Sequence, residues 1–229
     1  MNSLVKMDLS DSGLQEVIPM TLGNLKLLTF LDLRNNRLHG NLPGSFTEMK
    51  NLQELYLSNN PLGGPIDFLH WGNLQSLISL DLASSDYIGT IPESFGELKM
   101  LRYLALNDNN LTGKVPSELA TLPNVCSLLL NSNNLSGPLE FPSEFYERMG
   151  RYLALWGNPR LFYVTQNQNF VPNGVTVCSG VVRAGKSDGT SMNSVVGYGA
   201  RSCNLRTSII SFDSLIPSFI LGIFSGYWF

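Results

Sequence analysis

The chain has little charge and few histidines. Charged residues make up only 14% of its 229 residues and the formal net charge is −3, so the sequence lacks the positive field that attracts a phosphate backbone. Its two histidines, His39 and His70, have no metal-type spacing to Cys or Asp, and no arrangement of nucleophile, base and acid can be read from the sequence. We therefore predict no enzymatic activity, no cofactor, no bound metal and no nucleic-acid partner.

Cysteine is also scarce. The three cysteines, Cys126, Cys178 and Cys203, are an odd number, so at most one disulfide forms and at least one thiol stays free. Their count neither indicates nor excludes secretion. Cys126 precedes the inward-facing Leu128 by two residues, and we expect it to be a packed, unreactive thiol.

Leucine and asparagine, in contrast, are abundant and regularly spaced. There are 38 leucines and 22 asparagines, and 35 of the leucines lie at or before Leu161. The frame Leu-x-x-Leu-x-Leu-x-x-Asn-x-Leu-x-Gly-x-Ile-Pro recurs every 24 or 25 residues. Its six copies start at Leu4, Leu28, Leu52, Leu77, Leu101 and Val125, and a half-copy starts at Met149. This period predicts a solenoid of stacked coils, each stabilised by its neighbours.

Each position of the frame has a structural reason. Leucines at positions four and six share one face of a short strand and point into the solenoid. Asparagines at position nine can bond backbone groups of the adjoining coil that would otherwise be buried unpaired. Ser12 and Ser85 stand at this position in coils one and four, so we expect weaker coupling between coils there.

The repeats predict an α/β fold of right-handed coils, with a parallel β-sheet on the concave face and loops with short helical turns on the convex face. We assign residues 1–160 to the repeat domain, 161–204 to a C-terminal cap remnant and polar linker, and 205–229 to a hydrophobic C-terminal segment. Residues 1–5 lead directly into the first strand, so we expect the N-terminal end of the solenoid to lack a cap.

The Leu-x-Gly-x-Ile-Pro half of the frame resembles the plant-type extracellular leucine-rich repeats of receptor kinases, receptor-like proteins and polygalacturonase inhibitors, over residues 1–160. Residues 107–178, with Phe-Pro-Ser-Glu-Phe-Tyr and Trp-Gly-Asn-Pro-Arg-Leu, are similar to the receptor-like proteins related to Too Many Mouths and the Piriformospora indica-insensitive protein. The resemblance implies a leucine-rich-repeat solenoid that signals at the plant cell surface without a kinase domain. It also implies a cysteine that closes the C-terminal cap; Phe162 stands there instead and leaves Cys178 without that partner.

Outward side chains at positions three, five, seven and eight are expected to line the concave wall, in columns spaced about 4.8 Å from strand to strand. Aromatic and acidic residues alternate in these columns, which suits an extended peptide with basic and apolar side chains. The alternative is a solvated wall that binds nothing. The predicted contact residues are Phe30, Asp32, Arg34, Glu54, Tyr56, Asp81, Tyr103 and Asp108.

From these features we predict a non-catalytic cell-surface protein that binds a peptide or a receptor-kinase ectodomain and acts in plant signalling or defence. The alternative is a protein similar to the polygalacturonase inhibitors that docks on a cell-wall hydrolase, because the fold alone cannot separate the two.

Two glycosylation sequons begin at Asn110 and Asn134, each one residue after a position-nine asparagine and therefore facing outward. Residues Gly180–Ser187 match the phosphate-binding loop pattern. Glycines follow this motif where a helix would have to start, and too few residues remain for the required sheet, so we expect no nucleotide.

The last 15 residues, 215–229, are almost wholly apolar and would extend about 22 Å as a helix, short of the roughly 30 Å hydrocarbon layer. Together with small residues at 202–204 and a ten-residue spacer, they fit a glycolipid attachment signal with Ser202 as the modified residue. This predicts the extracellular face of the plasma membrane. The alternative is a tail-anchored protein with cytosolic repeats, which Arg201 and Arg206 favour.

Overall fold

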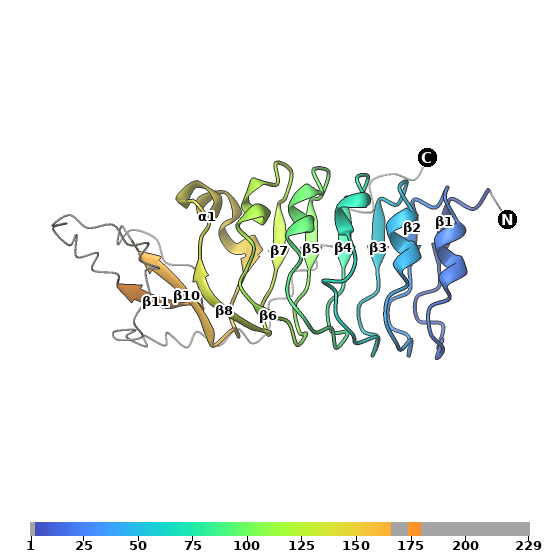
Figure 1. The fold of residues 1–229 in the computed structure, drawn as a ribbon, viewed down its shortest axis with the longest axis horizontal. Coiled ribbons are helices and arrows are strands. Elements are labelled where there is room, and N and C mark those ends of the chain that lie inside the picture. Colours follow the sequence, from blue (N-terminus) through green and yellow to red (C-terminus); the bar gives the residue numbers. More distant parts are fainter. Residues whose placement is uncertain (1–2, 166–173, 180–229) are drawn as a thin grey trace, which may run out of the picture.

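The computed structural model describes residues 3–165 and 174–179, which stack as consecutive coils along one axis (Figure 1). One strand from each coil joins a seven-stranded sheet in which all pairs are parallel, in the order β1-β2-β3-β4-β5-β7-β9. These strands are β1 (Lys6–Asp8), β2 (Phe30–Asp32), β3 (Glu54–Tyr56), β4 (Ser79–Asp81), β5 (Tyr103–Ala105), β7 (Ser127–Leu129) and β9 (Leu153–Ala154). The leucine-rich-repeat solenoid predicted from the period is confirmed.

A second, four-stranded parallel sheet runs along another side of the later coils, in the order β11-β10-β8-β6. Its strands are β6 (Thr112–Gly113), β8 (Asn134–Leu139), β10 (Arg160–Thr165) and β11 (Thr176–Ser179). It therefore continues past residue 160, where the sequence analysis placed the end of the repeat domain. Phe162, which stands where the resemblance implied a cysteine, is half-buried in β10.

Short helical turns form the remaining side of the coils. In coils one, two, four and five, the proline of the Ile-Pro position lies in an extended conformation directly before the turn and its carbonyl accepts the first hydrogen bond, as Pro43 O does from the Phe46 N–H at 3.0 Å. A proline has no N–H to lose at this position, which explains its place in the frame. The 3₁₀ turns are Met20–Asn24, Gly44–Glu48, Trp71–Asn73, Glu93–Glu97, Ser117–Thr121 and Gly150–Tyr152, and the α-helix α1 spans Ser143–Met149.

The leucines of position four form the centre of the core. Leu31, Leu55, Leu80 and Leu104 follow one another in register across β2 to β5, and all four are fully buried. Each buried leucine stabilises the fold by roughly 1.5–3 kcal/mol relative to an exposed one. At the C-terminal end, rings of Phe141, Phe145 and Tyr146 pack around α1 with centroids 4.7–6.5 Å apart.

The position-nine asparagines form the predicted ladder. In Asn109, Nδ2 donates to the carbonyls of Leu82 and Leu106, while Oδ1 accepts from the backbone N–H groups of Ser85 and Tyr87. The ladder comprises Asn36, Asn60, Asn109, Asn133 and Asn158, so it continues into the half-copy. The predicted start of the half-copy at Met149 is wrong by one residue: Leu153 pairs with Leu128, so the frame starts at Gly150 and Asn158 is at position nine.

Ser85 makes a weaker connection, as its short side chain predicts. Its hydroxyl donates to Leu57 O of the preceding coil at 3.3 Å and accepts no bond from that coil. The Leu62 N–H of the preceding coil bonds Asn60 O instead, and the Gly63 N–H bonds Ser85 O. The side chain of Ser85 therefore makes fewer hydrogen bonds between coils than that of Asn109 does.

Several sequence predictions fall outside the described residues. They are the phosphate-loop motif Gly180–Ser187, the attachment residue Ser202, Cys203 and the hydrophobic segment 205–229. In the part of the chain that is described, no helix has the length and hydropathy required to cross a bilayer.

The ladder predicts unequal costs for two substitutions. Asn109→Ala removes one acceptor and one donor that satisfy several buried backbone groups, and it should lower the free energy of unfolding by at least about 3 kcal/mol, since each unsatisfied group costs about 1–3 kcal/mol. Ser85→Ala should cost only about 1 kcal/mol. Urea denaturation followed by circular dichroism measures both, with the exposed neighbour Asn110→Ala as a control; equal losses at positions 85 and 109 would contradict the ladder account.

Candidate binding surface

The predicted contact residues lie in aligned columns on the seven-stranded sheet. The register places Phe30, Glu54 and Tyr103 in one column, with Ser79 between the last two. It places Asp32, Tyr56 and Asp81 in the next. The structure therefore brings six of the eight predicted residues together on β2 to β5, and Arg34 stands two residues after the end of β2.

Arg34 is the centre of this surface. Its guanidinium bonds both carboxylate oxygens of Asp32, with Nε at 3.0 Å from each and one terminal nitrogen at 2.5 Å from Oδ2. It also lies over the ring of Tyr56, with 4.7 Å between Cζ and the ring centroid. The ion pair and the cation–π contact fix a long, otherwise flexible side chain in one position on the wall.

The neighbouring side chains extend the same network. The Tyr56 hydroxyl donates to Glu54 Oε2 at 2.7 Å, and the ring of Phe30 lies 5.8 Å from that of Tyr56. Across the next strand, Ser58 Oγ donates to Asp81 Oδ2 at 2.7 Å. We call this set the inner-wall cluster; it comprises Phe30, Asp32, Arg34, Glu54, Tyr56, Ser58, Asp81 and Tyr103.

The cluster divides into supporting and accessible side chains. Asp32 is 1% exposed and Tyr56 is 8% exposed, because Arg34 and the adjoining columns cover them. The main role of these two buried side chains is to fix the position of Arg34, and little of their own surface is accessible. Phe30, Arg34, Glu54, Asp81 and Tyr103 are half-buried and remain accessible from the concave side.

Asp108 lies outside the cluster. It occupies position eight of coil five, where the backbone has a positive φ of 56°, and its exposed carboxylate accepts from Asn107 Nδ2 at 2.6 Å. Asp, Asn and Ser tolerate this left-handed conformation better than most residues do. The residues with a positive φ at position eight are Asp11, Asn35, Asn59, Ser84, Asp108 and Ser132, so this position serves the turn after each strand.

Sequence reasoning missed Ser58 and misjudged Cys126. Ser58 is at position seven of coil three, and Asp81 is at position five of coil four. This placement of a hydroxyl near an acid in the next coil was the signal for the hydrogen bond between them. The expectation of a packed Cys126 is wrong, because its thiol is free and exposed. Cys126 is at position two, directly before β7. Its backbone N–H donates to Arg102 O of the preceding coil, and its side chain lies outside the core.

Burial shapes the electrostatics of the cluster. Desolvation raises the pKa of Asp81, against the lowering effects of the Ser58 hydroxyl, the Ala83 N–H and Arg34. Hydrogen bonds to Asp32 raise the pKa of Arg34, which therefore stays charged. Burial raises the pKa of Tyr103 to about 12, so its phenol is a neutral hydrogen-bonding group near neutral pH. The wall thus presents a fixed cation beside a poorly solvated acid.

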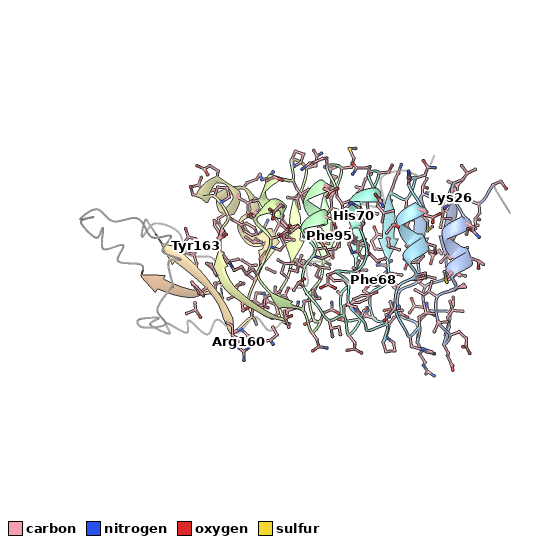
Figure 2. The ribbon with its side chains drawn as sticks, in the orientation of Figure 1. Lys26, Phe68, His70, Phe95, Arg160 and Tyr163 are labelled. Carbon is pink, nitrogen blue, oxygen red and sulfur yellow. The ribbon has the colours of Figure 1, made fainter. Side chains whose placement is uncertain are left out.

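The other titratable side chains make no comparable arrangement. Among the described residues, no group of three His, Cys, Asp or Glu side chains could hold a metal ion. His70 lies beside the turn that carries Phe95, with Nε2 3.8 Å from Glu97 Oε2, and both partners are exposed (Figure 2). Lys26 and Glu48 form an exposed ion pair of 2.6 Å between the first two coils, which contributes little to stability.

Comparison with known proteins agrees with this architecture. Leucine-rich-repeat family models match residues 2–62 and 100–122. Piriformospora indica-insensitive protein 2 of Arabidopsis thaliana is 51% identical over 53 residues, which are 23% of this chain and 12% of that protein. The crystal structure of Pollen Receptor Kinase 3 superposes with a TM-score of 0.61 at 31% identity, over 69% of this chain and 74% of the solved chain. The chain belongs to the leucine-rich-repeat receptor-like proteins of plants.

A receptor ectodomain of known ligand is similar as well. The Arabidopsis receptor kinase HAESA, solved in complex with an N-terminally extended IDA peptide hormone, superposes with a TM-score of 0.62 at 30% identity. The match covers 71% of this receptor-like chain and 26% of the HAESA chain. The chain therefore spans a small part of the length of several of its relatives.

The raised pKa of Asp81 predicts a pH-dependent stability difference. Because the folded state binds the Asp81 proton more tightly than the unfolded state does, ionisation costs stability as the pH rises above the ordinary value of 3.8. Asp81→Asn can keep the bonds to Ser58 and Ala83 without a charge. Urea unfolding between pH 3 and pH 7 should show the variant gaining stability relative to the wild type as the pH rises. The exposed Asp86→Asn is the control, and a difference that is flat or falls with pH would contradict this assignment.

Proposed function

We propose that this chain is a cell-surface binding protein of plant signalling or defence, without catalytic activity, which recognises a peptide or a receptor-kinase ectodomain on its concave face. The observation that carries the proposal is the inner-wall cluster, in which aromatic, acidic and basic side chains are aligned over four adjacent strands. The likeness to an ectodomain solved with a peptide hormone supports it.

The chemistry of the cluster favours an extended ligand with basic and apolar side chains. Asp81 is poorly solvated, and a cation supplied by a ligand would replace part of the lost hydration. Phe30 and Tyr103 offer half-buried rings on either side of Glu54 and Ser79. Half-buried aromatic residues beside charged groups are the residue types that dominate binding energy in protein interfaces. Arg34, held in place by Asp32, would bind a carboxylate of the same ligand.

We also propose the extracellular face of the plasma membrane as the location, with a glycolipid attached at Ser202. Asn110 and Asn134 are exposed on the side of the second sheet, where a glycan would not obstruct the concave face. The competing arrangement keeps the repeats in the cytosol on a C-terminal membrane anchor, and there these asparagines would stay unmodified.

The binding proposal predicts selective losses at the accessible side chains. Glu54→Gln keeps an acceptor for Tyr56 but removes the charge, and Tyr103→Ala removes a ring. Each should weaken binding about 10-fold or more, as interface hot spots do, while Glu97→Gln on the convex side leaves affinity unchanged.

Biolayer interferometry against a panel of secreted peptides, receptor-kinase ectodomains and cell-wall hydrolases measures these effects, with melting temperatures as a check of folding. Binding confined to a hydrolase would favour the inhibitor-like alternative. Binding that neither cluster variant weakens would overturn the site.

The location proposal predicts release from the cell surface. Treating intact plant cells with a phospholipase that cuts glycolipid anchors should move the protein into the medium, whereas Ser202→Leu should abolish this release. The released protein should carry glycans that Asn110→Gln and Asn134→Gln remove one at a time. Retention of an unglycosylated protein after treatment would instead indicate cytosolic repeats.

A further inference from the structure

The third coil is one residue longer than the other complete coils, with a spacing of 25 residues to the next copy against 24 elsewhere. In coil two, the buried ring of Phe46 stands four residues after the buried Leu42. In coil three, the equivalent buried ring of Trp71 stands five residues after Ile66. The extra residue therefore lies in the loop 67–70. Insertions in a repeat map to loops, often on a face that binds a partner.

This longer loop is anchored at its base and against the next coil. Trp71 Nε1 donates to Ile66 O at 2.9 Å, which closes the loop across its base. Asp67 Oδ2 accepts from the N–H and the hydroxyl of Thr90 in coil four, at 3.2 and 3.0 Å. The ring of Phe68, between these anchors in the sequence, is nevertheless 50% exposed (Figure 2). An anchored loop thus presents an apolar ring to solvent, and a ligand that covered this ring would gain apolar burial.

A groove begins at this loop and crosses coils three to six. Its volume is about 630 Å³, and none of its lining residues belongs to the seven-stranded sheet. The buried residues that line it are apolar, namely Leu69, Ile91, Pro92 and Val115. The carbonyl of Pro92 already accepts from the Phe95 N–H, so this part of the floor offers a ligand apolar contact. We call this surface the coil-three groove.

The rim of the coil-three groove is mainly acidic. Six exposed titratable side chains line it, four of them acids: Asp67, Glu93, Glu118, Glu140, Lys114 and His70. Among the described residues, Glu93, Glu118 and Glu140 form no ion pair. Three such carboxylates beside an apolar floor attract a positively charged ligand and repel an anionic one. The groove therefore suits neither an acidic peptide nor the surface of an anionic membrane.

We propose that the coil-three groove docks an extended basic segment of a partner protein. Side chains alternate between two faces of an extended chain, so apolar residues can pack on Phe68 and the floor while Lys or Arg side chains reach the three glutamates. Four coils at about 4.8 Å per coil span about 14 Å, which about five extended residues cover. The groove shares no residue with the inner-wall cluster, so both surfaces can be occupied at the same time.

Photocrosslinking with a short peptide tests where such a segment binds. The probe is Lys-Bpa-Lys-Leu-Lys, in which Bpa is p-benzoylphenylalanine, and Glu-Bpa-Glu-Leu-Glu is the control peptide. With the full chain in mild detergent, the basic probe should attach to residues 67–70 or 90–94, as identified by mass spectrometry, and the acidic probe should not. Glu54→Gln, which tests the concave face, should leave these crosslinks unchanged. Crosslinks confined to the inner-wall cluster, or none at all, would overturn the proposal.

Charge removal tests what the groove recognises. The triple variant Glu93→Gln/Glu118→Gln/Glu140→Gln should raise the concentration of basic probe needed for half-maximal groove crosslinking about 10-fold, because each exposed charge pair contributes a small favourable term. Raising the salt concentration should weaken crosslinking of the wild type in the same direction, since these charges are exposed.

A matched variant removes the same charge outside the groove. Glu97→Gln/Glu144→Gln/Glu147→Gln changes three exposed glutamates that do not line it, and the half-maximal concentration should stay within about twofold of the wild type. Phe68→Ser should raise that concentration about fivefold without lowering the melting temperature, because its ring is half exposed. Equal effects of the two triple variants, or a Phe68→Ser variant that crosslinks like the wild type, would show that the groove is not the docking site.

Discussion

Stacking of one coil on the next is the interaction on which the whole molecule depends. No coil of about two dozen residues can bury its leucines alone, and the zero exposure of Leu31, Leu55 and Leu80 exists because each has a coil on both sides. The asparagine ladder makes this stacking specific. Buried backbone groups need partners, and an amide at position nine supplies both a donor and an acceptor at the distance of one coil. Register between coils, and hence the alignment of the inner wall, follows from these two requirements.

On the inner wall, side chains that stabilise the fold lie beside side chains that we propose to bind a ligand. Asp32 is buried and its carboxylate is hydrogen-bonded by Arg34. The pair therefore fixes a guanidinium on the wall, while the carboxylate of Asp32 is not accessible. Asp81, in contrast, keeps an acceptor pair that is satisfied by Ser58 and Ala83 while its pKa is raised by burial. A carboxylate in that condition is better suited to meet an incoming cation than one already paired with arginine. The columns thus place side chains that we propose to contact a ligand next to side chains whose contacts hold the wall itself in place.

The period of the leucines was sufficient to predict the solenoid, the parallel sheet and the columns, because those depend on spacing alone. It was insufficient where a neighbour in another coil decides the outcome. Tyr56 is covered because Arg34 of the preceding coil lies over it, and no single-coil pattern contains that contact. Asp108 belongs to a turn because position eight takes a positive φ, a backbone property that the choice of Asp, Asn or Ser at this position only hints at. Cys126 is exposed because position two lies before the strand, although its apolar character suggested the core.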